Sequence, residues 1–316
     1  MNNNLKRVNE ESILFFDIET ASNSSELVPD SREYGLFKRK MDKANELTEA
    51  ETISLYNEKA PLTMCYTRIV SIGVGFIKNG ELYIKAIEGE EENVIKEFCT
   101  IANSFDYLCG LNIKGFDAPM IYNNGFRYFD MTTMLNSRFI TSGVKPWDLD
   151  KSYIDLMEIF KGTHYMNSSL DEICYHFGVE SPKSELDGSM VSHEFWNNGA
   201  ERISQYVKQD VLASASIFRR MRWEKPFTYF IDRSSVKQKE PTILEKLNAT
   251  KNISTKDIET LKGILSKKRI SKKNKDIVVD LIQAALIDVD PNFGKINNQD
   301  YIEDVINDIR EEIFKK

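Results

Sequence analysis

The chain has 316 residues, of which 41% are hydrophobic and 29% are charged, as in a soluble globular protein with one large domain or one medium and one small domain. Its net charge of −7 argues against a protein that coats nucleic acid by bulk charge, but not against an enzyme with a local basic groove. We find no signal-peptide core, and no apolar run approaches the roughly 18 residues of a membrane span. The four cysteines form no C-x-x-C pair, so we expect reduced thiols in a cytoplasmic protein, without a disulfide framework or a zinc site.

The first predicted strand lies within residues 12–20, where the apolar run Ile-Leu-Phe-Phe is followed by Asp17 and Glu19. Side chains alternate along a strand, so these two carboxylates point to the same face. Two such acids at the end of a hydrophobic strand repel each other unless a cation lies between them, and a divalent cation with oxygen ligands is the usual solution. Taken alone, the pattern also fits a strand that ends in two solvated acids.

The next segments predict an insertion followed by a hairpin. Residues 22–62 are polar and highly charged with helical spacing, which indicates an insertion of one or two surface helices. Residues 68–77 and 81–87 read as strands joined by the turn signal Asn79-Gly80. With the first strand they predict three antiparallel strands in sequence order.

An alternation of helices and strands follows and predicts an α/β fold. We expect an amphipathic helix at 90–105 and a buried strand at 107–112, parallel to the first strand. Segment 153–160 fits either a last strand or a strand that runs into a helix. Further helices are predicted at 117–124, at 131–141, from a capping signal at 168–172, and at 201–221.

The C-terminal part has a different composition. A polar segment that ends at Pro241 is a plausible boundary, and beyond it we expect a small all-α domain over residues 243–316. It is short for independent stability, so it would dock on the main domain or on a partner. Its lysine-rich stretch, residues 260–276, would either guide single-stranded nucleic acid or form a solvated surface.

Two other segments carry polar chemistry beside apolar structure. Residues 110–117 place Asn112, Phe116 and Asp117 at a strand-to-helix junction, where α/β folds put their sites, although a turn with a capping aspartate fits the same residues. Tyr206 and Asp210 are four residues apart and share an otherwise apolar helix face. An acid on such a face needs a counter-charge, the alternative being an exposed helix acid.

Together the three segments contribute four carboxylates, from Asp17, Glu19, Asp117 and Asp210. Four acids cannot converge without cations, so we expect two divalent ions and the two-metal apparatus of phosphoryl transfer. Mg²⁺ and Mn²⁺ both suit a site with oxygen ligands only.

The order Phe-Asp-Ile-Glu-Thr, Asn-x-x-x-Phe-Asp and Tyr-x-x-x-Asp resembles the three motifs of the DEDD 3′–5′ exonucleases. The tyrosine four residues before the last acid is typical of the tyrosine branch. The histidine branch would have a histidine five residues before that acid, where this chain has Gln205. The chain is similar to the stand-alone exonucleases that resemble the proofreading domain of family B DNA polymerases, over about residues 12–222. Segments 145–148, 153–157, 168–170 and 181–188 look like accessory motifs of that group.

The resemblance implies a ribonuclease H-like fold in residues 1–235, with a mixed sheet of three antiparallel strands and then parallel strands, flanked by helices. It also implies roles for single residues. Asp17 would bridge both metals, Glu19 and Asp210 would complete the site of the metal that holds the water, Asp117 would serve the second metal, and Tyr206 would orient the attacking water. Asn112, Phe116 and Thr20 would contact the terminal nucleotide, and Lys183 would either contact a phosphate or be an ordinary surface lysine. We expect a structural role for Asp155 in preference to that of a fifth ligand, and no catalytic role for His164, His176 and His193.

By the same resemblance, the protein would release nucleoside monophosphates from single-stranded DNA 3′ ends during replication or repair. No polymerase signature follows the exonuclease-like region, so any proofreading would occur in trans, with a DNA polymerase or replication complex bound through the C-terminal helices. Two alternatives remain open: a 3′–5′ exoribonuclease on the same fold, and a nuclease-fold binding or assembly module that acts through the helical tail.

Overall fold

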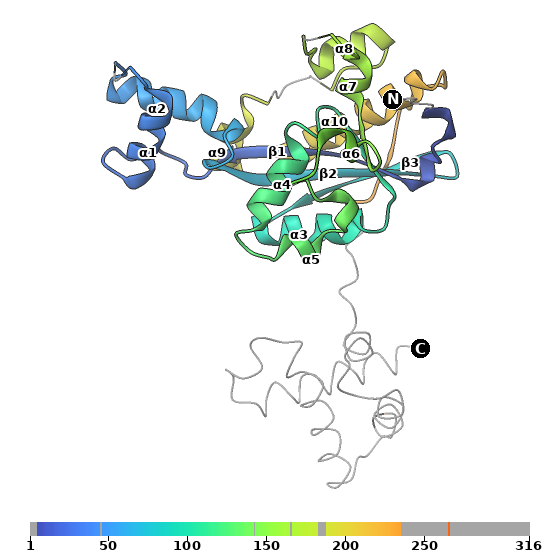
Figure 1. Cartoon of the computed structure of the whole chain (residues 1–316), viewed down its shortest axis with the longest axis horizontal. Helices are drawn as coiled ribbons and strands as arrows, with labels where there is room; N and C mark the ends of the chain where they lie inside the picture. Colours follow the sequence, from blue (N-terminus) through green and yellow to red (C-terminus); the bar gives the residue numbers. More distant parts are fainter. Residues whose placement is uncertain are drawn as a thin grey trace. The chain divides into compact units, whose positions relative to one another are not determined.

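The computed structural model describes residues 5–44, 46–141, 143–164, 166–182 and 188–234, together with Leu265. The chain divides into two compact units, Met1–Ser235 and Val236–Lys316. The first unit contains a six-stranded mixed sheet in the order β5-β4-β1-β2-β3-β6 (Figure 1). The helices predicted within 243–316 lie outside the described residues. Among the residues that are described, no helix is both long and apolar enough to cross a membrane.

Three antiparallel strands form the centre of the sheet, as the sequence predicts. β1 (Ile13–Ser22) pairs with β2 (Thr67–Lys78), which pairs with β3 (Glu81–Glu88). The predicted turn joins β2 to β3, and both Asn79 (φ 53°) and Gly80 (φ 79°) have the left-handed backbone that a tight hairpin turn requires.

Parallel strands extend the sheet at both edges. β4 (Tyr107–Gly110) lies parallel to β1, and β5 (Tyr153–Asp155) lies parallel to β4. The ambiguous segment 153–160 is therefore a strand that runs directly into a helix, α7 (Leu156–Lys161). At the opposite edge, β6 (Ile231–Asp232) pairs with β3, and its two residues are too few to show any periodicity in the sequence.

Helices cover both faces of this sheet (Figure 1). Leu14, Phe16 and Ile18 of β1 pack on the side of α3 (Glu91–Ala102), α4 (Asp117–Gly125) and α5 (Met131–Met134). Ile13 and Phe15 point the other way, toward α7, α8 (Leu170–Phe177) and α10 (Glu201–Met221). The remaining short elements are α6 (Pro146–Leu149), α9 (Val191–Asn198), and the 3₁₀ turns Leu5–Arg7, Glu10–Ser12, Ala60–Leu62 and Ser137–Phe139.

The helix predicted over 131–141 is wrong in length, because α5 ends after one turn. The Asn103 side chain donates to the Met134 carbonyl oxygen (2.9 Å) and accepts from the backbone N–H of Asn136 (2.8 Å). It satisfies two backbone groups where the chain leaves the helix. An extended Leu135 and the 3₁₀ turn Ser137–Phe139 follow, and Leu135 and Phe139 pack into the same core.

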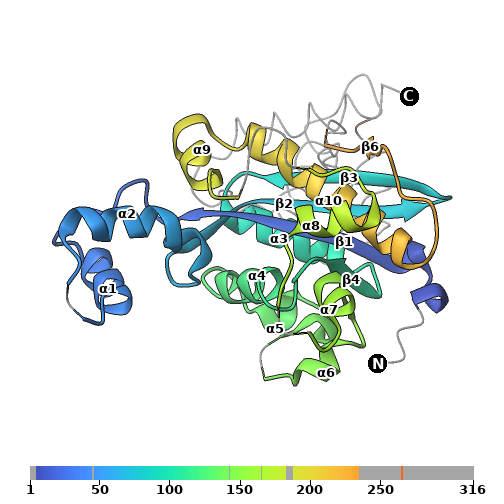
Figure 2. The same cartoon turned by 90° about the horizontal axis from the view of Figure 1, so that it is seen from above.

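Residues 22–62 contain two helices, α1 (Arg32–Met41) and α2 (Glu49–Lys59), which lie beyond the C-terminal end of β1 (Figure 2). They share an aromatic core in which the Phe37 ring lies edge-on to Tyr56 and to Tyr66, with centroids 5.0 and 5.1 Å apart. Such pairs add stability beyond that of the buried area.

Two glycines of β2 set the distance between the sheet and α10. A Cβ atom on Gly73 would lie 2.8 Å from Cγ2 of Val211 and 2.9 Å from the carbonyl oxygen of Val207, and one on Gly75 would lie 2.7 Å from Val211. Gly73 is the register partner of Asp17 on β1. The absence of a side chain therefore allows α10 to approach the sheet beside the first acid of the predicted site.

We expect Gly73→Ala to lower the free energy of unfolding by about 1–3 kcal/mol, because the added methyl group overpacks a rigid helix–sheet contact. Gly35→Ala in α1 is the control, since no described residue would lie within 4 Å of the added Cβ atom and glycine is unfavourable within a helix. Urea denaturation would measure both variants. Equal stability of the two would contradict the proposed close packing.

Candidate active site

Three acids converge between β1 and α10. One carboxylate oxygen from each of Asp17, Glu19 and Asp210 lies within 4.8 Å of the other two, a set that could hold a metal ion. Glu19 and Asp210 are buried and Asp17 is half-buried. Asp17 and Glu19 share the face of β1 that α10 covers, as alternation along the strand requires.

Asp117 reaches the acids from the α4 side. It is the first residue of α4, it is buried, and its Oδ1 accepts a hydrogen bond from the backbone N–H of Ile18 (3.1 Å). β4 pairs with β1 only as far as Phe15, so the Ile18 N–H has no partner strand on that side. The acid therefore satisfies a buried backbone donor while its charge remains close to Asp17 and Glu19.

Burial and mutual repulsion make these carboxylates hard to ionise together. Burial raises the pKa of Asp17 well above its usual range, and the Asp210 charge raises it further. Burial likewise raises the pKa of Glu19, followed by the charges of Asp17, Asp210 and Asp117. The pKa of Asp117 is also raised by burial and by Asp17. Ionisation of the whole cluster therefore needs compensating positive charge.

Asp155 is a buried acid with a different environment. Its Oδ1 accepts from the backbone N–H groups of Asn112 and Met157 (both 3.0 Å), and its Oδ2 accepts from that of Lys114 (3.0 Å). It caps α7 and holds the loop between β4 and α4. These contacts support the structural role predicted for Asp155.

The same loop carries Asn112 and Phe116. Asn112 is exposed and has a left-handed backbone (φ 56°), a conformation that asparagine tolerates better than most residues. Phe116 is half-buried against the core and directly precedes Asp117. Both side chains therefore lie on the loop that leads to the fourth acid.

Tyr206 lies one helical turn before Asp210 on α10. It is half-buried and packs against the apolar cluster of Ala21, Val70, Val191 and Ile203. Ala21 lies on β1 two residues after Glu19. Tyr206 thus lies on the same helix as Asp210, one turn away, and its role in the site remains a prediction.

Other predicted residues lie elsewhere. The buried Thr20 hydroxyl donates to the Pro61 carbonyl oxygen (2.8 Å) and ties the insertion to β1, and the contact of Thr20 with a nucleotide remains a prediction. Lys183 lies outside the described residues. His164, His176 and His193 do not join the acid cluster.

The sequence reasoning missed α9, which closes the C-terminal end of β1. The Ser22 backbone N–H donates to Oγ of Ser192 (3.1 Å), and Nε1 of Trp196 donates to Oγ of Ser22 (3.2 Å). It also missed Arg68, at the start of β2, whose guanidinium lies over two aromatic rings of α9. The local signal for both was the aromatic pair Phe195-Trp196, in the second half of α9.

A comparison with known families identifies the enzyme class. A family model described as a predicted 3′-5′ exonuclease related to the exonuclease domain of PolB matches residues 60–258, well over half of the chain. The chain belongs to this family. The match confirms the predicted enzyme class, and the sheet confirms the mixed α/β fold.

The matched segment of the exonuclease contains Asp117, Tyr206 and Asp210, whereas Asp17 and Glu19 precede it, on the other side of the helical insertion. The fold brings these separate parts of the chain together. A comparison with curated proteins found no match to the chain.

The raised pKa values predict the pH dependence of stability in the metal-free exonuclease. A carboxyl group whose pKa is raised by folding binds more protons in the folded state, so stability falls as the pH rises through the folded pKa values, which lie well above 3.8 for Asp17 and 4.5 for Glu19. We expect Asp17→Asn to raise the melting temperature at pH 8 by about 2–4 °C, since it relieves about 1 kcal/mol of repulsion.

Glu91→Gln is the matched control, measured by the same thermal melts in a chelator. Glu91 is a buried acid whose oxygens accept from the Ile69 N–H, from Asn124 and from Tyr128, so its replacement should lower the melting temperature. A loss of stability in Asp17→Asn as large as that in Glu91→Gln would contradict the repulsion described above.

Proposed function

We propose that this exonuclease depends on two divalent cations, Mg²⁺ or Mn²⁺, held by Asp17, Glu19, Asp117 and Asp210. The observation that carries the proposal is the cluster of Asp17, Glu19 and Asp210, whose ligand atoms lie within 4.8 Å of one another, with Asp117 close enough for its charge to raise the pKa of Glu19. A cation at this position would remove the repulsion that raises the acids' pKa values. The donor set is made of carboxylate oxygens alone, which suits hard cations.

The positions of the acids suggest how they divide the work. Asp17, Glu19 and Asp210 could hold one cation, and Asp17 with Asp117 would hold the second, so Asp17 would serve both. When bound, the cations supply an activated water as nucleophile and stabilise the departing 3′ oxygen. The protein contributes a buried surrounding that strengthens these electrostatic interactions.

The remaining residues would orient water and nucleotide. Tyr206 lies one helical turn before Asp210, and its phenol would donate to or accept from the attacking water and so fix the direction of attack. Phe116 offers an aromatic face to the terminal base, and Asn112 offers an amide from a loop that Asp155 holds in place. Together they would place the last phosphodiester bond over the acids.

The substrate that we propose is the 3′ end of single-stranded DNA, with release of nucleoside monophosphates during replication or repair. The relation of the family to the PolB exonuclease domain supports DNA. A 3′–5′ exoribonuclease is the alternative, decided by how the site treats the 2′-hydroxyl. Family membership and the clustered acids Asp17, Glu19 and Asp210 argue against a module that only binds or assembles. Proofreading in trans and a polymerase partner remain predictions, as does the role of the C-terminal segment.

Digestion of 5′-labelled single-stranded DNA and RNA with Mg²⁺ or Mn²⁺ tests this function. We expect a ladder that shortens from the 3′ end, faster on DNA, and abolished in Asp17→Asn. Tyr206→Phe should lower kcat by about 10²-fold, since it removes a group that orients the nucleophile. Tyr83→Phe removes a phenol that bonds Glu81 on β3 and should leave the rate unchanged.

A faster ladder on RNA would move the proposal to the exoribonuclease. If neither polymer is shortened, the proposed function is wrong. The clustered acids Asp17, Glu19 and Asp210 would then serve another purpose.

Metal binding has its own readout. We expect Mg²⁺ or Mn²⁺ to raise the melting temperature of the wild type more at pH 8 than at pH 6, because protons compete for acids whose pKa is raised. Asp17→Asn should lose this rise while Glu97→Gln, a partly exposed acid of α3 paired with Lys85, keeps it. An equal rise in both variants would place the cations elsewhere.

A further inference from the structure

Arg68 is a cation at the rim of the acid site. It is the second residue of β2 and pairs with Ala21, two residues beyond Glu19 on β1. Its guanidinium carbon lies 5.3 Å from the ring centre of Phe195 and 5.6 Å from that of Trp196, both on α9. The side chain keeps 24% of its surface exposed, so it remains accessible from solvent.

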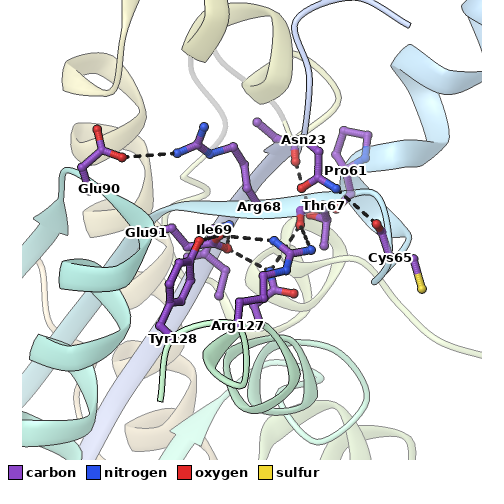
Figure 3. Close-up of polar contacts among 12 residues, drawn as sticks. Asn23, Pro61, Cys65, Thr67, Arg68, Ile69, Glu90, Glu91, Arg127 and Tyr128 are labelled. Atoms are coloured by element: carbon purple, nitrogen blue, oxygen red, sulfur yellow. Dashed lines mark hydrogen bonds and ion pairs between the residues drawn. The ribbon is translucent and has the colours of Figure 1, made fainter. Parts of the chain in front are cut away.

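Its charge is weakly paired. Within the described parts of the chain, the guanidinium has one ion pair, with Oε2 of Glu90 at 3.9 Å, and that carboxylate is 86% exposed (Figure 3). Among the same residues, the buried Nε has no acceptor. A buried N–H without an acceptor costs free energy, and a weakly hydrated, planar guanidinium is well suited to bind a phosphate.

Arg127 shows the contrast. It lies next to Arg68 in the same view, but its guanidinium bonds the buried Glu91 (3.4 Å) and the carbonyl oxygen of Thr67 (3.4 Å) (Figure 3). Glu91 also accepts from Tyr128. The charge of Arg127 is therefore used within the fold, whereas the one ion pair that Arg68 makes with the described residues is long and solvated.

Arg68 also lies on the side of the sheet where catalysis is proposed. Phe195, which its guanidinium covers, packs against the same apolar cluster as Tyr206. We propose that Arg68 binds a phosphate of the nucleic-acid strand whose 3′ end lies at the acids. This inference rests on the proposed exonuclease function and adds the residue that holds the strand.

The electrostatics of the chain favour such a contact. A protein with a net charge of −7 and a cluster of buried acids repels a polyanion, so local cations must hold the strand. The two rings of α9 hold the guanidinium in position before binding, which lowers the entropic cost. Glu90 competes for the same charge and is displaced when the phosphate binds.

Binding of a labelled single-stranded DNA to the full chain tests the inference, in an Asp17→Asn background that leaves the DNA intact. Arg68→Met keeps an apolar stem on the rings and removes the charge. We expect about tenfold weaker binding, the worth of one charged hydrogen bond, and a salt dependence (log Kd against log salt) that is shallower by about 0.7. Arg68→Lys should restore most of the salt dependence.

Arg138→Met is the matched control. Its guanidinium also lies over an aromatic ring, Phe139 at 5.5 Å, but it pairs closely with Asp106 (2.9 Å), whose backbone N–H bonds Ser12 just before the start of β1. We expect no change in affinity. Glu90→Gln should tighten binding by more than Glu92→Gln, an exposed neighbour, and only when Arg68 is present.

A DNA strand with one uncharged methylphosphonate linkage, moved stepwise from the 3′ end, locates the contact without relying on a variant that folds poorly. Wild-type affinity should fall at one linkage near the 3′ end, and Arg68→Met should lose that dependence. If wild type digests DNA but no linkage depends on Arg68, the inference is wrong and the exonuclease function stands. If wild type neither binds nor digests DNA or RNA, both fail.

Discussion

The close approach of α10 to the sheet is the constraint on which the rest of the site depends. Val207 and Val211 sit directly over Gly73 and Gly75, where any side chain would collide with them. Because Asp210 lies between these valines on the helix, the same contact brings its carboxylate to Asp17 and Glu19. Apolar packing of the helix therefore supplies the free energy that holds like charges together.

Environment, not residue type, separates the two buried aspartates that follow β4 and β5. Asp155 accepts several backbone N–H groups and serves as a helix cap, so its lone pairs are used within the fold. Asp117 accepts from the Ile18 N–H and faces other acids, whose charges raise its pKa. A bound cation would therefore stabilise the carboxylate of Asp117, whereas that of Asp155 is already stabilised by backbone N–H groups.

The surroundings also distinguish two arginines, Arg68 near the start of β2 and Arg127 after α4. The guanidinium of Arg127 pairs with a buried carboxylate and donates to a carbonyl oxygen, and so contributes to stability. Arg68 is supported by aromatic rings, which attract its charge without saturating its N–H groups. An arginine held in this way can take up an anion from solution.

By itself the sequence determined the features whose signal is local. Alternation placed Asp17 and Glu19 on one face, the spacing of Tyr206 and Asp210 placed them on one helix side, and Asn79-Gly80 marked the hairpin. Tertiary structure decided what depends on distant partners. Asn103 ended the helix at Met134, Pro61 took the Thr20 hydroxyl, and α9 gathered rings around Arg68. These contacts join residues 31 to 128 positions apart, and no local pattern of propensity or period carries that information.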